Sequence, residues 1–284
     1  MASRQTKKSL NNSRPSIKEF LQKNAGALEP QELDQLLALA LHKKIEYIYK
    51  KPEKLLSHST ILSFKKLLRK RLAGWSLAYL KGYKEFYGLK FLVSKNTLIP
   101  RPESELIIDE ALKFTQNKQN IIDIGTGTGC LILSLAKNNN QTASYLATDI
   151  SLAALKTART NARKLGLNKQ IKFLQSNLLK KIPAKKFAIV MANLPYLTPQ
   201  QLKEPSIQKE PRLALLAGKD GLNYYRQLLE QLPNYLADKY LILLEIDPAQ
   251  HELIKKIIKA QLPQAKIEFL KDLANNIRIV KVSQ

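Results

Sequence analysis

A tetrapeptide in the second half of the chain, Asn193-Leu194-Pro195-Tyr196, has the residue types needed to hold a planar NH2 group. An amide or exocyclic amino nitrogen attacks an activated methyl group poorly, because its lone pair is delocalised into the neighbouring π-system. The side-chain carbonyl of Asn193 and the main-chain carbonyl of Leu194 can accept its two hydrogens and stabilise the positive charge that develops on the nitrogen. This pattern indicates methyl transfer to a planar nitrogen.

The other two residues of the tetrapeptide fit the same interpretation. Pro195 fixes its own φ and favours an extended conformation at Leu194, which would aim the Leu194 carbonyl outward from the end of a strand. Tyr196 offers a flat face to a flat acceptor group. The alternative is a strand-ending turn without a catalytic role, because Asn and Pro are common turn residues.

A glycine-rich turn, Asp123-Ile-Gly-Thr-Gly-Thr-Gly129, predicts a binding site for the methyl donor. Residues 121–124 have the pattern of a short buried strand and residues 131–136 begin an apolar helix, so the glycines lie at a strand-to-helix junction. Glycines let the main chain approach a ligand closely, and the first N–H groups of a helix can bind it. The spacing matches neither a dinucleotide site nor a phosphate loop.

Polar residues also follow the next two predicted strands. Asp149 follows residues 143–148 and can accept hydrogen bonds from a ribose diol, although it can also cap the next helix in competition with Ser151. Asn177 follows residues 171–174 and is placed to contact an adenine edge. Ligands of parallel sheets bind at the carboxyl ends of strands, and the candidates that fall there are Gly125, Asp149, Asn177 and Asn193. S-adenosylmethionine needs this set of contacts.

The chain from residue 101 onward alternates strands with helices. Beyond the strands already named, the pattern predicts strands at residues 187–192, 240–245, 266–269 and 277–282. Alternation implies a parallel sheet with right-handed crossovers, and the short spacing of the last two strands implies an antiparallel pair. We therefore expect an α/β domain with a seven-stranded sheet over residues 101–284.

The residues before this domain predict a small helical bundle over residues 16–80. Ser16 and Glu19 form a capping box at its start. Amphipathic leucine-rich stretches follow at residues 32–41 and 59–72. Their apolar faces are expected to form a core of their own.

Two further segments flank this bundle. Residues 81–100 carry aromatic and β-branched residues around two glycines, which predicts a β-hairpin that links the domains. Residues 1–15 are basic and polar with no acidic residue, which predicts a disordered arm. A transit peptide is less favoured because the arm has no apolar stripe.

The chain carries a large positive charge, with 47 Lys and Arg against 23 Asp and Glu and a formal net charge of +24. Such a charge suits a nucleic-acid partner. The lysines are spread along the whole chain, however, as a general lysine-rich composition would also produce. We expect nucleic-acid contact to be secondary. The charge is expected to raise the rate at which the protein encounters a partner more than it raises specificity.

The cysteines and histidines limit the other classes of function. The single cysteine, Cys130, excludes an internal disulfide, suits a reducing cytoplasm and is expected to be a small buried helix residue. The scattered histidines His42, His58 and His251 have no companion cysteines, which argues against zinc. No apolar run approaches the length of a membrane span. We expect a cytoplasmic monomer that binds neither metal nor membrane.

Several segments together resemble the protein-(glutamine-N5) methyltransferases, the family that includes the release factor glutamine methyltransferases. They are Leu98-Ile-Pro-Arg-Pro-Glu-Ser-Glu105, the glycine turn, Asp149, the tetrapeptide, Glu210-Pro-Arg-Leu-Ala-Leu215 and Asp220-Gly-Leu222. The resemblance covers the chain from Trp75 to the end. It implies a Rossmann-like domain, S-adenosyl-L-methionine as cofactor, a glutamine of a peptide chain release factor as acceptor, and an N-terminal domain that docks this protein substrate.

The resemblance also implies roles for individual residues. Cofactor contacts are implied for Gly125, Thr126, Gly127, Thr128, Gly129, Asp149 and Asn193, and catalytic and substrate contacts for Asn193, Leu194, Pro195 and Tyr196. The family usually has Asn-Pro-Pro-Tyr, so Leu194 replaces a proline while its carbonyl is kept. The family often has Asp-Trp where this chain has Asn177-Leu178, so apolar cover by Leu178 would replace aromatic stacking on adenine.

Other acceptors share the chemistry of the tetrapeptide. Asn-Leu-Pro-Tyr also occurs in the ribosomal RNA adenine-N6 dimethyltransferases, and adenine N6 of RNA or DNA presents the same planar NH2 group. In those RNA enzymes the glycine turn lies near the N-terminus and a helical domain follows, whereas here more than a hundred residues precede Asp123. Motif order therefore favours glutamine. A ribosomal-protein glutamine methyltransferase would share every motif and stays an alternative.

Overall fold

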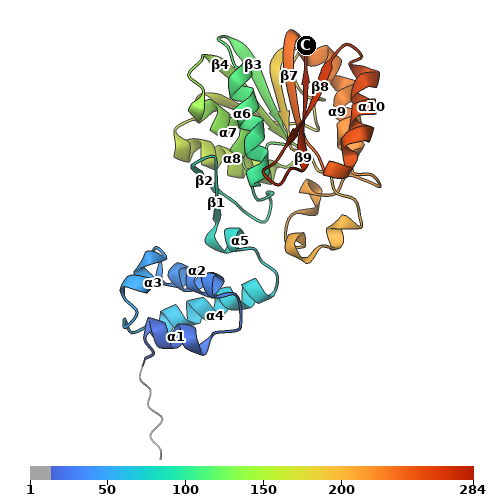
Figure 1. Ribbon diagram of the computed structural model, residues 1–284. Coiled ribbons are helices and arrows are strands. Elements are labelled where there is room, and N and C mark those ends of the chain that lie inside the picture. Colours follow the sequence, from blue (N-terminus) through green and yellow to red (C-terminus); the bar gives the residue numbers. More distant parts are fainter. Residues whose placement is uncertain (1–13) are drawn as a thin grey trace, which may run out of the picture. The chain divides into compact units, whose positions relative to one another are not determined.

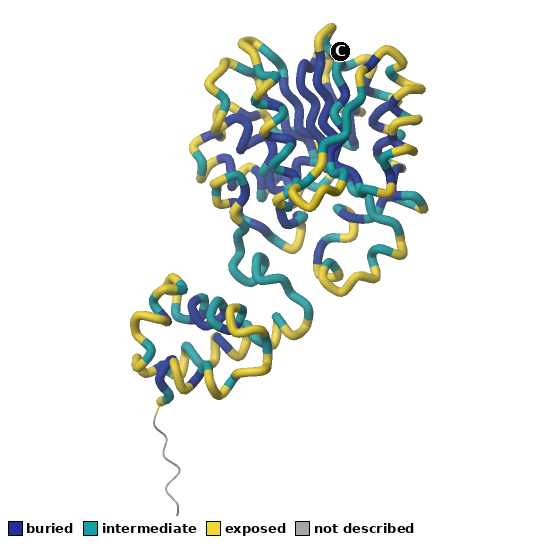
Figure 2. Tube along the Cα trace, viewed as in Figure 1, coloured by how far each residue is buried: buried dark blue, intermediate teal, exposed yellow. Residues whose placement is uncertain are grey.

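The computed structural model describes residues 14–284, which divide into two compact units, one ending at Lys81 and the other beginning at Gly82. The predicted basic arm at residues 1–15 lies outside the described residues, apart from residues 14 and 15. Each unit has its own hydrophobic core (Figures 1 and 2).

The first unit is helical, as its leucine spacing predicts. Ser16 caps the first helix through the expected capping box with Glu19. The edge of the Phe20 ring meets the face of Phe64, with 5.0 Å between ring centroids, in a core formed by the apolar faces of the helices. The helices are α1 (Ile17–Lys23), α2 (Pro30–Leu41), α3 (Glu46–Lys50), α4 (His58–Leu72) and α5 (Leu77–Lys81).

The second unit is built on a seven-stranded sheet in the order β5-β4-β3-β6-β7-β9-β8. The strands from β5 to β7 are parallel, and β9 runs antiparallel to both β7 and β8. The predicted parallel sheet and its antiparallel final pair are therefore confirmed. The strands are β3 (Gln119–Ile124), β4 (Ala143–Asp149), β5 (Ile171–Gln175), β6 (Phe187–Ala192), β7 (Leu236–Glu245), β8 (Lys266–Lys271) and β9 (Ile277–Ser283).

Helices cover both faces of this sheet (Figure 1). Because side chains alternate along a strand, Ile121 and Ile189 pack in one apolar layer with α6 and α7, whereas Ile122 and Val190 pack in the other with α9 and α10. The central strands are buried on both faces, which accounts for their continuous apolar runs. The helices are α6 (Glu105–Phe114), α7 (Cys130–Asn138), α8 (Leu152–Leu165), α9 (Asn223–Gln231) and α10 (His251–Gln261).

The predicted hairpin consists of β1 (Tyr83–Phe86) and β2 (Leu89–Leu92), which pair antiparallel. The side chain of Asn161 in α8 holds this hairpin against the rest of the second unit. Its Oδ1 accepts from the Leu92 N–H at 2.8 Å, and its Nδ2 donates to the carbonyls of Leu92 at 3.1 Å and Thr128 at 2.9 Å. One buried amide thus connects the hairpin to the glycine turn.

Strand register brings the polar strand-end residues to one edge. Ile124 of β3 is paired with Thr148 of β4 and with Ala192 of β6, and Ala192 is paired with Leu244 of β7. The next residues along these strands are Gly125, Asp149, Asn193 and Glu245. All of them therefore leave the sheet at the same end.

Candidate active site

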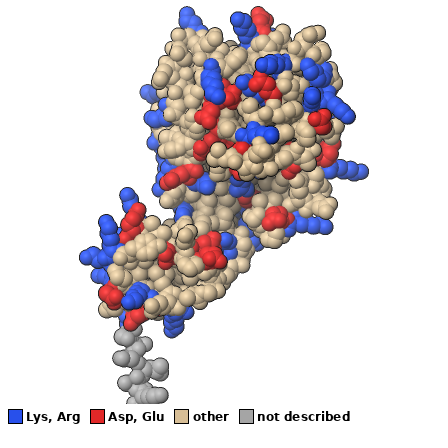
Figure 3. Space-filling view, viewed as in Figure 1, with Lys and Arg blue, Asp and Glu red and all other residues tan. Residues whose placement is uncertain are grey.

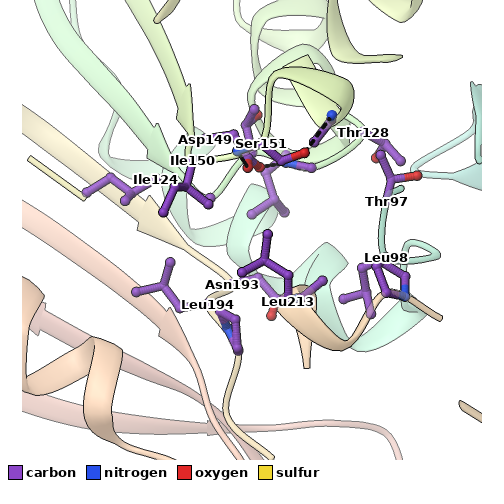
Figure 4. Close-up of a pocket in the computed structure, with 18 of the residues that line it drawn as sticks. Thr97, Leu98, Ile124, Thr128, Asp149, Ile150, Ser151, Asn193, Leu194 and Leu213 are labelled. Carbon is purple, nitrogen blue, oxygen red and sulfur yellow. Dashed lines mark hydrogen bonds between the residues drawn. The ribbon is translucent and has the colours of Figure 1, made fainter. Parts of the chain in front are cut away.

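A cavity of about 250 Å³ opens at the carboxyl ends of the parallel strands. In Figure 4, Asp149, Ile150 and Ser151 lie on one side of it, Asn193, Leu194 and Leu213 on another, and Thr97 and Leu98 on a third. The predicted site residues that line it are Gly125, Thr126, Gly127, Thr128, Asp149, Asn177, Asn193, Leu194 and Pro195. The structure therefore brings most of the predicted site together.

The glycine turn follows β3 directly and places main-chain atoms against the tetrapeptide. Gly125 has φ +74°, and a Cβ at this position would lie 2.9 Å from Cδ2 of Leu194. The N–H groups of Gly125 and Thr126 both donate to the Thr148 carbonyl, at 2.9 and 2.8 Å. These bonds fix the turn to β4, so it is shaped before any ligand arrives.

Asp149, at the end of β4, has both carboxylate oxygens in hydrogen bonds. Oδ2 accepts from the Gly127 N–H at 2.9 Å and Oδ1 from the Ser151 N–H at 2.8 Å. Ser151 is the N-cap of α8, because its side chain accepts from the Ala154 N–H. Burial raises the pKa of Asp149, and the bonds from Ser151 and Gly127 oppose that shift.

Residues after β5 form the part of the cavity wall next to Asp149. Ser176, Asn177 and Leu178 line it, and Leu178 is buried with φ +51° in the core layer of α9 and α10. The apolar side chain of Leu178 is thus available to a flat ring in the cavity. Its contact with adenine stays a prediction.

The Asn193 side chain has one end paired and the other unpaired. Nδ2 donates to Oε2 of Glu245 at 2.7 Å and to Oγ of Ser104 at 3.1 Å. Oδ1 is buried and accepts no hydrogen bond from the described residues. Leaving a buried acceptor unpaired costs about 1–3 kcal/mol, so this oxygen in the cavity wall is suited to receive a donor from a ligand.

Leu194 is held through its main chain. Its N–H donates to the hydroxyl of Tyr225 in α9 at 3.3 Å, and that hydroxyl donates in turn to the main-chain carbonyl of Glu245. Among residues 14–284, no hydrogen bond ends on the Leu194 carbonyl. The acceptor atoms predicted from the sequence, Oδ1 of Asn193 and the carbonyl oxygen of Leu194, thus both lack a hydrogen-bond donor within the described part of the chain.

Two predicted residues do not line the cavity. Gly129 has φ +80°, and a Cβ there would lie 2.8 Å from Leu133 and 3.3 Å from Ala158, so this glycine serves helix packing. The hydroxyl of Tyr196 donates to Oε1 of Glu245 at 3.1 Å, beside the Asn193 bond. Stacking of the Tyr196 ring on a substrate stays a prediction.

Another acid lies behind the glycine turn. Asp123 is fully buried, its Oδ2 accepts from the Thr126 hydroxyl at 2.6 Å, and its Oδ1 has no partner among the described residues. Burial raises its pKa to about 7. Cys130, the first residue of α7, lines the cavity and is only partly buried, and burial raises the pKa of its thiol to about 12.

The segment between β6 and α9 also contributes to the cavity wall. Glu210, whose side chain is 3% exposed, forms an ion pair with Arg101 and accepts from the Ile99 N–H at 3.1 Å. Pro211 and Leu213 from this segment line the cavity together with Leu98, which lies in the same stretch of chain as Ile99 and Arg101. Two of the segments that carry the family resemblance are thus bound to each other.

Glu245, Ser104 and Tyr225 were not among the site residues predicted from the sequence. Glu245 had a usable signal, because it ends an apolar strand as Asp149 does. Ser104 lies within the segment at residues 98–105 that was quoted for the resemblance. Tyr225 has the spacing of an ordinary core residue in α9, and nothing in its local sequence marks its hydroxyl.

Figure 3 shows Lys and Arg interspersed with Asp and Glu over the visible face rather than gathered in one patch. Residues 14–284 contain no cluster of three or more His, Cys, Asp or Glu side chains arranged to hold a metal ion. Within the same range, no helix has the length and apolar character needed to cross a membrane.

Comparison with known families assigns both units. The methyltransferase small domain matches residues 103–210, and the PrmC N-terminal domain matches residues 16–82. The release factor glutamine methyltransferase of Bacillus cereus is 33% identical over 228 residues, which cover 77% of this chain and 80% of that protein. That of Bacillus subtilis is 35% identical, with 76% and 78% covered.

Longer relatives and solved structures also match. The bifunctional methyltransferase of Rickettsia prowazekii is 31% identical over 272 residues, and the match spans 87% of this chain but only 52% of that protein. The hMettl16 catalytic domain matches 70% of this chain and 76% of its own with a TM-score of 0.54 and 19% identity. A methyltransferase from Pyrococcus furiosus matches 77% and 98% with a TM-score of 0.52 and 17% identity. These structures support the fold alone.

Proposed function

Because this chain belongs to the release factor glutamine methyltransferase family, we propose that it methylates the side-chain amide nitrogen of a glutamine in a peptide chain release factor, with S-adenosyl-L-methionine as the methyl donor. The observation that carries this proposal is the unpaired, buried Oδ1 of Asn193 in the cavity wall. Beside it, the Leu194 carbonyl is the second acceptor for the NH2 group of a glutamine.

The residues at the other end of the cavity fit S-adenosylmethionine. The glycine turn brings main-chain atoms close, Asp149 has lone pairs left for ribose hydroxyls, and Asn177 and Leu178 provide a polar and an apolar contact for adenine. When bound, this cofactor supplies a sulfonium methyl group that a nitrogen can take by direct displacement. Asn193 and Leu194 would then align the acceptor nitrogen and stabilise its developing charge.

No residue of the tetrapeptide needs to act as a strong base. An amide that has gained a methyl group and a positive charge is a strong acid, so its proton leaves readily once the new bond has formed. The Asn193 and Leu194 oxygens already hold the two N–H groups in the proposed arrangement. Their contribution is greatest when the nitrogen is positive, which is differential stabilisation of the transition state.

The helical unit is proposed to dock the release factor. Exposed apolar side chains on its surface include Tyr49, Leu55, Leu62 and Leu72, and its own core is complete without them. Leu62→Ser is expected to raise the KM for intact release factor while methylation of a short glutamine peptide keeps its rate. An equal effect on both substrates would argue against docking by this surface.

A labelling experiment tests the acceptor. The purified protein is incubated with methyl-labelled S-adenosylmethionine and, in separate reactions, with release factor, ribosomal protein and ribosomal RNA. Label on a glutamine of the release factor is expected. Label only on RNA would assign an adenine methyltransferase, and label only on a ribosomal protein would assign the other glutamine acceptor. Either result would overturn the proposal.

A further inference from the structure

We propose that Glu245 makes the site selective for a side-chain amide over a side-chain carboxylate, by fixing which end of the Asn193 amide faces the cavity. This inference rests on the proposed function, since the acceptor is taken to be a glutamine. Glu245 ends β7, is 2% exposed and does not line the cavity itself. It is therefore a positioning residue that acts through Asn193.

The hydrogens of the Asn193 amide are already committed within the protein. Nδ2 donates to Oε2 of Glu245 at 2.7 Å and to Oγ of Ser104 at 3.1 Å. An amide NH2 group has two hydrogens, so none remains for a ligand. Oδ1 is the one polar atom of this side chain that has no partner among the described residues, and it can only accept.

The directions of the neighbouring bonds show why the amide cannot rotate. The Ser104 hydroxyl oxygen accepts from Nδ2 of Asn193, and the Ser104 hydroxyl hydrogen is donated to Oε2 of Glu245. Tyr196 donates to the other oxygen of the same carboxylate at 3.1 Å. Both oxygens of Glu245 thus act as acceptors.

An Asn193 amide turned by half a revolution would place its carbonyl oxygen against Oε2 of Glu245. Two acceptors would then face each other at hydrogen-bond distance in a buried site, where repulsion is strong and water cannot relieve it. The turned amide would also leave its NH2 group without the charged partner it now has. The carboxylate therefore holds the amide in one orientation.

This orientation distinguishes glutamine from glutamate. The NH2 group of glutamine donates to Oδ1 of Asn193 and to the Leu194 carbonyl. A glutamate carboxylate would bring oxygen atoms to the same two acceptors, with the charge of Glu245 behind them. Sites whose buried polar groups would be left unpaired reject the wrong ligand by factors of roughly 10⁴, so strong discrimination is expected from this arrangement.

Glu245→Gln tests the inference with Glu210→Gln as the matched control. The first variant keeps the shape but replaces the carboxylate with a group that can donate to the Asn193 carbonyl. The second makes the same change at another buried glutamate, which is bonded to Arg101 and the Ile99 N–H rather than to Asn193. Affinity is measured in the presence of S-adenosylhomocysteine for release factor and for a release factor whose acceptor glutamine is replaced by glutamate.

The wild type is expected to prefer the glutamine form by at least about 100-fold, and Glu245→Gln to reduce that preference by about 10-fold or more. Glu210→Gln is expected to keep the preference within about 3-fold of the wild type, because substitutions without shared partners act nearly independently. An unchanged preference in Glu245→Gln, or an equal loss in Glu210→Gln, overturns the inference. A wild type that binds neither form refutes the proposed function, and the inference with it.

A measurement on the wild type covers the case in which Glu245→Gln does not fold. The side-chain NH2 signals of Asn193 are assigned in a nitrogen–proton correlation spectrum by their loss in Asn193→Asp. Slow exchange with water is expected, because both hydrogens are buried in hydrogen bonds to Glu245 and Ser104. Exchange as fast as that of an exposed asparagine overturns the inference whatever the substrate is.

Discussion

Replacing Asn193 with alanine is expected to reduce turnover far more than cofactor affinity. The substitution removes Oδ1, a buried acceptor without a partner among the described residues, and also the two hydrogen bonds that Nδ2 makes to Glu245 and Ser104. Loss of one preorganised polar group at a reacting centre lowers kcat by roughly 10²–10³, or about 2.7–4 kcal/mol in the barrier. The expected kcat is therefore lower by that factor.

The cofactor end of the cavity is expected to be almost unaffected. Asp149 and the glycine turn are held by bonds to Gly127, Ser151 and Thr148, none of which involves Asn193. Substitutions without shared partners act nearly independently, so binding of S-adenosylhomocysteine is expected to weaken by less than about 10-fold.

Two assays separate these effects. Transfer of labelled methyl to release factor at saturating cofactor gives kcat, and titration calorimetry with S-adenosylhomocysteine gives cofactor affinity. Asn177→Ala is the control, because Asn177 lines the same cavity beside Asp149 and is expected to raise the KM for the cofactor more than it lowers kcat. A kcat for Asn193→Ala within a few-fold of the wild type would refute the assigned role. So would a loss of cofactor affinity as large as the loss of turnover.

Three further substitutions test the surrounding structure by urea denaturation. Tyr225→Phe leaves the Leu194 N–H and the main-chain carbonyl of Glu245 unpaired, so a loss of about 2–4 kcal/mol in unfolding free energy is expected. A loss below about 0.5 kcal/mol would contradict the role of the Tyr225 hydroxyl. Arg101→Ala leaves Glu210 as a buried unpaired charge and is expected to cost about 3 kcal/mol, of which Glu210→Gln in the same chain should restore a part. The Asp123 carboxyl has its pKa raised by burial from 3.8 to about 7, so the unfolded chain loses this proton near pH 4 and the folded chain near pH 7. The unfolding free energy of the wild type should therefore fall across this window as the pH rises, by roughly 4 kcal/mol at most. Asp123→Asn should not show this fall. Profiles of unfolding free energy against pH that run parallel in the two proteins would refute the raised pKa of Asp123.

The sheet and most of the cavity could be predicted because their signals are local. The apolar runs that end at Ile124 and Ala192 are long enough to mark buried strands, and a parallel sheet places their carboxyl ends together. The register of β3 with β4 and β6 then brings Gly125, Asp149 and Asn193 to one edge. Composition, strand pattern and the resemblance all pointed to the same architecture.

The hydrogen-bond network behind the tetrapeptide could not be predicted in the same way. Glu245 lies 52 residues from Asn193 and 141 residues from Ser104 along the chain, and no periodicity records which side chains meet across such distances. Gly129 shows a second limit, since a Cβ at this motif glycine would meet Leu133 and Ala158, a packing requirement that the sequence of the turn does not reveal. Spacing identifies a turn, but packing decides what each of its residues does.

The acids at this edge of the sheet make the fold less stable than its apolar layers would allow. Asp123, Asp149 and Glu245 each lie in or at the end of a strand, and burial raises the pKa of all three. A raised acid pKa means that the folded state disfavours the charged form, so each carboxylate destabilises the protein at neutral pH. Such residues are expected where ligand chemistry rather than packing determines the side chain. Asp149 lines the cavity, whereas Asp123 and Glu245 are bonded to residues that line it, Thr126 and Asn193. The destabilising acids are thus grouped around the proposed site, where such residues are expected.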